Sequence, residues 1–187
     1  MVRIITDSAA DFEPIELERM QISCIPLKVM FGTTEYEENI SLTKNQFYDK
    51  MLETGTLPKT SQAAPQVLAD LFDEAKAAGD EAIYFTLSSS LSGTWQSAMF
   101  IQEDLGYPGA YVVDTCNATG GQRMLVEYAV RLRDEGKCAA DIVEAVEALR
   151  QRVVLYACIN TLEYLYKGGR CSLRGRFLPA PGSAHGQ

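Results

Sequence analysis

Short apolar segments alternate with amphipathic segments along most of this chain. The apolar segments have the length and composition of strands and lie at 2–5, 22–31, 81–87, 111–113 and 153–159. The segments between them place apolar residues at helical spacing, at 14–20, 41–54, 65–78, 94–104, 120–135 and 141–152. Strands that alternate with helices are typical of a mostly parallel sheet whose two faces are covered by helices. The sequence therefore predicts an α/β fold of this kind.

Two places depart from this regular alternation. The segment 22–31 turns at Gly32 into a short partner at 35–37, which predicts a hairpin, and Pro26 indicates an edge strand or a bulge. Near the end, a strand at 153–159 and a helix at 161–166 begin a further unit, and the composition after Arg170 becomes rich in glycine and proline.

These changes in composition suggest domain boundaries. We expect residues 1–151 to form the α/β domain and residues 152–170 to be the poorly anchored start of a second α/β domain. Residues 171–187 are expected to be a disordered or out-of-frame tail. An end at 187 that is natural, a frameshift or an artificial boundary would account equally well for this composition.

A polar stretch joins the predicted strand at 81–87 to the helix at 94–104. Residues 88–94 contain four serines, a threonine and Gly93. A strand–turn–helix joint presents backbone N–H groups and the positive end of the helix dipole, and glycine lets a ligand approach closely. The combination suits a carboxylate or a phosphate. A serine-rich turn with an ordinary helix cap explains the local sequence equally well.

Two further polar segments occupy comparable positions. Asp7 and Ser8 follow the first strand, where open α/β sheets bind ligands, although both could simply cap the next helix. We favour a mixed role in which Asp7 organises the loop. Thr60 and Ser61 lie between two prolines, just before the helix at 65–78. Taken alone, this second segment would be an ordinary capped loop.

Charge and residue counts exclude several classes of function. Seventeen basic and 25 acidic residues give a net charge of −8, which argues against nucleic acid and anionic membrane surfaces as partners. No apolar run is long enough to span a bilayer. Five cysteines without C-x-x-C spacing indicate reduced thiols in a cytoplasm and make a zinc site improbable. The single histidine, His185, and the absence of a G-x-S-x-G motif argue against a Ser-His-Asp triad.

Six short motifs occur in a fixed order between residues 2 and 170. They are Thr6-Asp7-Ser8, Lys59-Thr60-Ser61-Gln62, the serine-rich stretch at 88–94, Val113-Asp114-Thr115, Gly120-Gly121 and Lys167-Gly168-Gly169-Arg170. In this order they resemble the DegV family of fatty-acid-binding proteins. That family is similar to the binding subunit of the bacterial fatty acid kinase system, which serves phospholipid metabolism.

The resemblance implies a two-domain α/β protein that buries one long-chain fatty acid between its domains. It implies that Thr60, Ser92 and Gly93 hold the carboxylate. It also implies that a partner kinase phosphorylates this carboxylate to an acyl phosphate. This chain would then present the substrate without being an enzyme, and it would need no metal and no cofactor other than the bound fatty acid.

Further residues are candidates for the same site. They are Ser61, Ser89, Asp7, Ser8 and Arg170. Arg170 suits a phosphorylated head group or the kinase surface, because its planar guanidinium makes bidentate contacts. The same Lys167-Gly168-Gly169-Arg170 motif is also explained by a helix C-cap followed by cations.

Two alternatives to a binding module are open from the sequence. One is an enzyme that acts on a phosphorylated or acyl substrate with Ser89 or Ser92 as nucleophile, although only Lys59 and Asp114 are conceivable bases. The other is a non-functional truncated product. Family members continue past the Gly-Gly-Arg motif into a domain that supplies the other wall and a head-group histidine, and His185 does not match it. We therefore expect little or no tight fatty-acid binding by the 187-residue chain.

Overall fold

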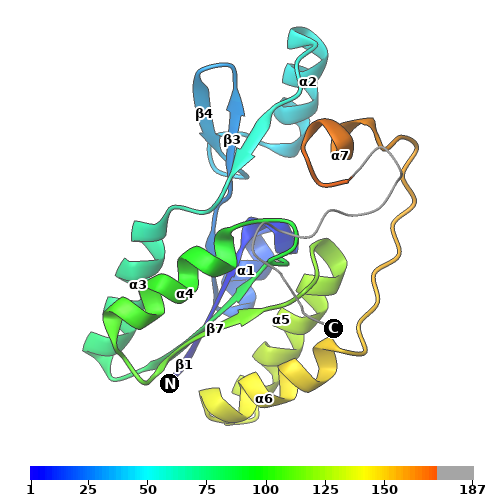
Figure 1. The fold of residues 1–187 in the computed structure, drawn as a ribbon. Helices are drawn as coiled ribbons and strands as arrows, with labels where there is room; N and C mark the ends of the chain where they lie inside the picture. The colour runs from blue at the N-terminus through cyan, green and yellow to red at the C-terminus, as the bar shows by residue number, and fades with distance from the viewer. Residues whose placement is uncertain (172–187) are drawn as a thin grey trace.

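The computed structural model of this protein describes residues 1–171, and its elements alternate largely as the sequence predicts (Figure 1). In chain order they are β1 (Val2–Asp7), the short 3₁₀-helix η1 (Ser8–Ala10), α1 (Pro14–Met20), β2 (Ile22–Ile25), β3 (Lys28–Phe31), β4 (Thr34–Glu37), α2 (Lys44–Thr54), β5 (Lys59–Ser61), α3 (Pro65–Ala78), β6 (Glu81–Thr86), α4 (Thr94–Leu105), β7 (Ala110–Asp114), α5 (Thr119–Asp134), α6 (Ala139–Arg150) and α7 (Glu163–Lys167).

The main sheet has four strands in the order β2-β1-β6-β7, and every neighbouring pair is parallel. Ile4 of β1 lies opposite Ile22 on one side and Ile83 on the other. The two central strands are almost entirely buried, as expected for strands covered on both faces. The predicted parallel sheet is thus confirmed.

Helices cover both faces of this sheet, with α3 and α4 on one side and α5 and α6 on the other (Figure 1). On the first face, Phe72 packs in one cluster with Ile5 and Tyr84. On the second face, Leu125 and Ile142 pack in one cluster with the opposite side of the sheet. Because successive side chains of a strand point to opposite faces, each central strand contributes to both cores.

A second, antiparallel sheet has the strand order β4-β3-β5 and carries α2. Its small core contains Phe31 and Phe47, whose rings meet edge to face with centroids 5.8 Å apart. The predicted hairpin is present, but the single strand predicted at 22–31 is wrong. Pro26 lies between β2 and β3, which belong to different sheets, and proline cannot donate a ladder hydrogen bond.

Three other local predictions differ from the structure. Lys59–Ser61 forms a strand that pairs with β3, although these residues are predicted as a loop. The helix predicted at 141–152 begins two residues earlier as α6, whose N-cap is Cys138, and Asp141 lies in its first turn. Residues 153–159 form no strand and most of their side chains are exposed. In the part of the chain that the structure describes, no strand lies beside this segment to pair with it, so its backbone has no ladder to join.

The segment after α6 runs along one side of the molecule up to α7 (Figure 1). Val153 packs against the core beneath α5 and α6, and Cys171 is buried beside Leu162, whose carbonyl lies 3.9 Å from the Cys171 thiol. The tail predicted at 171–187 lies outside the described residues except for Cys171. Within residues 1–171, each helix is too short or too polar to cross a bilayer.

Candidate functional site

Three segments far apart in the sequence line one open groove of about 950 Å³. The first is the end of β5 with Gln62, and the second is the loop at 88–93 between β6 and α4, which we call the serine loop. The third is the end of α7, up to Arg170. The groove is lined by Leu27, Thr60, Ser61, Gln62, Leu87, Ser89, Ser90, Leu91, Ser92, Gly93, Gln96, Leu165, Gly168, Gly169 and Arg170.

The backbone of the serine loop is held from beneath by side chains and carbonyl groups of other elements. The Leu87 N–H, just before the loop, donates to Asp7 Oδ2 at 2.8 Å. The Ser88 N–H donates to the Asn117 carbonyl at 2.7 Å, and the Ser89 N–H donates to Asp114 Oδ1 at 3.2 Å. The first N–H groups of the loop therefore fix its shape and are not available to a ligand.

The donors that face the groove lie at the end of the loop. Gly93 is the N-cap of α4, and its N–H has no hydrogen-bond partner within residues 1–171. Ser92 Oγ accepts from the Thr94 N–H at 3.3 Å and lies 2.9 Å from Thr94 Oγ1. Thr94 is buried, so its hydroxyl needs this partner. When Thr94 donates, the Ser92 hydroxyl hydrogen is available to the groove.

Thr60 and Arg170 meet where β5 and the end of α7 line the groove. Thr60 is exposed on β5, and its hydroxyl oxygen accepts from Arg170 Nη2 at 3.4 Å. Arg170 Nη1 also donates to the carbonyl of Gly168. Gly169 has a φ of 76°, as expected for a glycine that ends a helix. The Lys167-Gly168-Gly169-Arg170 motif therefore both ends α7 and places a guanidinium group on the wall of the groove.

The β5 segment approaches the serine loop closely at Gly93. A Cβ atom added to Gly93 would lie 3.4 Å from Gln62 Oε1. A side chain here would thus be in ordinary contact with the end of Gln62, so the two polar segments lie next to each other at this point. Of the residues singled out from the sequence, the structure brings together on this groove Thr60, Ser61, Ser89, Ser92, Gly93 and Arg170.

Asp7 and Ser8 do not line the groove and act beneath it instead. The Ser8 hydroxyl donates to Glu38 Oε2 at 2.6 Å and accepts from the Leu27 N–H at 2.9 Å, so it ties the main sheet to the second sheet. Asp7 is fully buried, and its Oδ1 caps η1 by accepting from the Ala9 N–H at 3.1 Å. Burial raises the pKa of Asp7 to about 6. The part of the expected mixed role in which Asp7 organises its loop agrees with this geometry, and its part in ligand binding stays a prediction.

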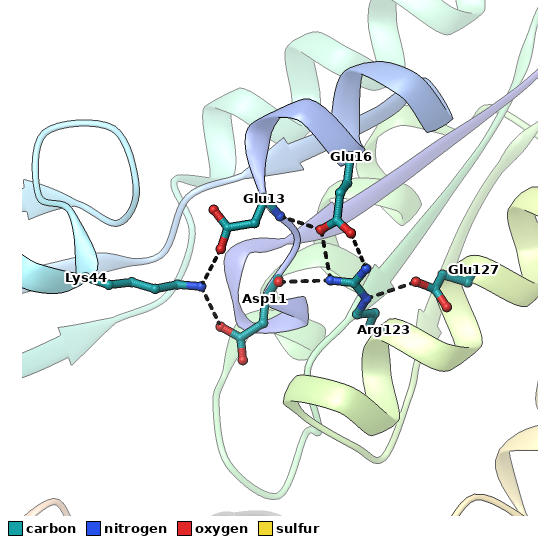
Figure 2. A network of polar contacts seen from close by, with 6 residues as sticks. All are labelled: Asp11, Glu13, Glu16, Lys44, Arg123 and Glu127. Carbon is teal, nitrogen blue, oxygen red and sulfur yellow. Dashed lines mark hydrogen bonds and ion pairs between the residues drawn. The ribbon is translucent and has the colours of Figure 1, made fainter.

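A network of ion pairs connects α1, α5 and the start of α2 (Figure 2). Arg123 of α5 pairs with Glu16 at 2.5 Å and with Glu127 at 2.9 Å. The Arg123 guanidinium lowers the pKa of Glu16 to about 2. Lys44, at the start of α2, pairs with Glu13 at 3.0 Å. The network therefore joins α1, α5 and α2, and it helps to hold the unit that carries Thr60.

Comparison with known families decides where the chain belongs. Residues 1–178 match the family model described as "Uncharacterised protein, DegV family". The chain belongs to the DegV family. A DegV domain-containing protein of Clostridium perfringens is 36% identical over 175 residues, which cover 90% of this chain and 60% of that protein.

Solved structures of DegV proteins share this fold. A fatty-acid-binding DegV family protein of Thermus thermophilus gives a TM-score of 0.79 at 31% identity, over 90% of this chain and 60% of that one. A stearic-acid-binding protein of Eubacterium ventriosum gives 0.78 at 27% identity, over 94% and 63%. This DegV chain therefore spans about 60% of the length of the relatives it matches.

Within residues 1–171, no serine hydroxyl of the groove of this DegV chain is hydrogen-bonded to a side chain that could act as a base. Asp114 Oδ1 accepts from the backbone N–H groups of Ser89 and Cys116, not from a serine hydroxyl. Ser92 Oγ pairs with Thr94 and, within residues 1–171, with no carboxylate or lysine. The same residues contain no group of side chains suited to hold a metal ion.

Sequence reasoning missed two residues that support the site of this DegV chain. Gln122 of α5 is fully buried and donates to Asp7 Oδ1 at 3.0 Å. Asn117 is buried and its carbonyl accepts from the Ser88 N–H. One signal could have pointed to Gln122: it is a polar residue on the apolar face of a helix, directly after Gly120 and Gly121. No local pattern pointed to Asn117.

Proposed function

We propose that this chain supplies the head-group wall of a site for a long-chain fatty acid. In this proposal the carboxylate lies between the Thr60 hydroxyl, the Ser92 hydroxyl and the Gly93 N–H. The observation that carries it is the convergence of these three donors on one groove beside Arg170. The two solved structures compared above, one described as stearic-acid-binding and the other as a fatty-acid-binding DegV family protein, support the class of ligand.

The chemistry of the groove suits a carboxylate with an apolar tail. Hydrogen bonds to a charged group contribute about 1.5–3 kcal/mol each when they are shielded from water. Ser61 and Ser89 add hydroxyl groups along the same walls, and Leu27, Leu91 and Leu165 offer apolar contacts to the first carbons of the tail. Each buried methylene adds about 0.8 kcal/mol, so affinity should rise with the length of tail that the protein covers.

The proposal extends to the fate of the bound acid. We propose that the protein presents the carboxylate to a partner kinase, which forms the acyl phosphate, and that this chain is not itself the catalyst. The open groove leaves the head group accessible, and Arg170 beside Thr60 suits a phosphate. No cofactor is needed beyond the fatty acid. A cytoplasmic location belongs to the same proposal and rests on the odd number of cysteines without disulfide spacing.

A soluble short-chain acid tests the head-group site on the 187-residue chain. Decanoate would be titrated into ¹⁵N-labelled protein while backbone amide signals are followed. We expect Gly93, Ser92 and Thr60 to shift together in a saturable manner, since their donors would meet one carboxylate. Decanol is the matched control, because it has the same tail without the charge, and it should shift Gly93 far less. Saturable shifts confined to other parts of the molecule would reject the site.

A further inference from the structure

The carboxylate of Asp7 collects three N–H donors from three different elements. Its Oδ2 accepts from Leu87, its Oδ1 accepts from Ala9 at 3.1 Å, and the same Oδ1 accepts from Gln122 Nε2 at 3.0 Å. Leu87 directly precedes the serine loop, and Gln122 belongs to α5. Asp7 is therefore the point where the end of β1, the loop and α5 are held together.

Gln122 completes the arrangement but leaves one of its own atoms unsatisfied. Its Nε2 donates to Asp7, to Thr6 Oγ1 at 3.1 Å and more weakly to the Phe85 carbonyl at 3.5 Å. Its Oε1 is buried and has no hydrogen-bond partner within residues 1–171. A buried amide oxygen without a donor is unfavourable, so the protein tolerates this atom for the sake of the contact with Asp7.

Within residues 1–171, no cationic side chain lies close enough to Asp7 to stabilise its negative charge. The titratable groups that face it are Glu38 after β4, the Cys24 thiol on β2 and the Tyr84 hydroxyl on β6. Glu38 adds to the effect of burial and raises the pKa of Asp7. The three N–H donors alone stabilise the ionised form, so ionisation and the hydrogen bonds that hold the loop depend on each other.

Protonation would change this hydrogen-bond set. A neutral carboxyl group has an O–H that must find an acceptor, and it accepts fewer N–H donors than a carboxylate does. Gln122 Oε1 is the adjacent buried acceptor without a donor. A half-turn of the Gln122 amide brings Oε1 to the Asp7 proton and takes Nε2 away from Thr6. The neutral pair therefore requires a different set of hydrogen bonds from the ionised pair, because Gln122 no longer donates to Thr6 or to the Phe85 carbonyl.

We propose that Asp7 and Gln122 are positioning residues for the candidate carboxylate site, which hold the serine loop in its groove-facing form only while Asp7 is ionised. The ionised pair fixes Leu87, and through Leu87 it sets where Ser92 and Gly93 lie. The role of this Asp7–Gln122 pair in ligand binding rests on the proposed function. The existence of the pair does not, because every hydrogen bond that forms it joins two groups of the protein itself.

The test follows the pair by NMR in the ligand-free 187-residue chain. Between about pH 5 and pH 8, the side-chain NH₂ signals of Gln122 and the amide signals of Leu87, Ser92 and Gly93 should all change with one common midpoint. Asp7→Asn should abolish the change. Asp114→Asn is the matched control, since Asp114 holds the other side of the same loop through Ser89, and it should leave the Leu87 response in place.

Gln122→Met is a second variant for the same test. It keeps the volume of the side chain and leaves Asp7 itself in place. It removes a hydrogen bond that favours the ionised form, so the common midpoint should move to higher pH. Constant Leu87 and Gln122 signals in the wild type would overturn the proposal. A titration at Leu87 that Ser92 and Gly93 do not follow would overturn it as well, because the pair would then not position the groove. Failure of decanoate to bind would reject the proposed function but not this pair.

Discussion

The Ser8 hydroxyl donates to the Glu38 carboxylate at 2.6 Å and so joins two sheets that share no strand. Ser8 also accepts from the Leu27 N–H, in the short connection between β2 and β3. Because Thr60 lies on β5, next to β3, this contact helps to determine where Thr60 stands relative to the serine loop. The width of the groove is therefore set in part by a residue that does not touch it.

We expect Ser8→Ala to destabilise the protein by about 1–3 kcal/mol, because it removes a hydrogen bond to a charged group and leaves the Leu27 N–H without its acceptor. Urea unfolding checks this value through a lower midpoint with an unchanged slope. Ser90→Ala is the control, since Ser90 is exposed, and it should change stability by less than about 0.5 kcal/mol. Equal stabilities of the two variants would contradict the role given to Ser8.

The pH dependence of stability provides a second prediction. The pKa of Asp7 is raised from 3.8 to about 6 in the folded protein, so between these values the folded state binds more protons than the unfolded state. Stability contributed by this group therefore falls as pH rises from about 4 to about 6, by up to about 3 kcal/mol. Other carboxylates titrate in the same range. The quantity to measure is thus the difference between wild type and Asp7→Asn by urea unfolding at each pH.

Relative to Asp7→Asn, the wild type should lose stability across this window and then stay level above about pH 7. A difference that is constant from about pH 4 to pH 7 would show that Asp7 has an ordinary pKa. A difference that grows in favour of the wild type as pH rises would show that a cation or further donors stabilise the charge.

Much of the fold could be predicted because its signals are local. The helix at Pro65–Ala78 agrees with its apolar spacing and its opening proline, and β6 agrees with its apolar run. Pro26 indicated an edge or a bulge, yet only the pairing of its neighbours shows that the chain leaves one sheet for another there. Lys59–Ser61 is polar and short, so its strand exists only because β3 provides a partner.

The site was only partly predictable, for a related physical reason. Its hydroxyl groups and glycine stand in recognisable motifs, whereas the contacts beneath them join residues far apart in the sequence. Asp7 meets Leu87 and Gln122 through single hydrogen bonds, and no periodicity records such a contact. Serine-rich composition also suggested several available N–H groups, but the loop uses most of them to hold itself in place.

The head-group proposal predicts the effect of removing its two hydroxyl groups. Thr60→Ala together with Ser92→Ala should weaken decanoate binding by about tenfold or more, since each removes a hydrogen bond to a charged group. The protein should remain folded, since Thr60 is exposed, but Ser92→Ala takes away the partner of the buried Thr94 hydroxyl and should lower stability by about 1–3 kcal/mol. Affinity is measured from the Gly93 amide shift, and circular dichroism checks the fold.

Thr56→Ala is the control for the double variant. It removes an exposed hydroxyl near β5 whose contact is with Thr54, away from the groove. Decanoate affinity should equal that of the wild type. If the double variant also kept wild-type affinity, the carboxylate would have to lie elsewhere on the protein.

Arg170 separates two explanations of the Lys167-Gly168-Gly169-Arg170 motif. If its guanidinium belongs to the groove wall, Arg170→Ala should lower decanoate affinity by roughly threefold to tenfold through loss of a charge-assisted contact beside Thr60. Arg170→Lys should recover only part of this loss, since an ammonium group lacks the planar fork. Gly169 keeps its left-handed conformation in both variants, so α7 should end as it does now. Lys167→Ala, which breaks the pair with Glu163 inside α7, should leave affinity unchanged. If the Arg170 and Lys167 variants instead behaved alike, with affinity intact and only the helix signals altered, the motif would be a helix cap and Arg170 would have no part in binding.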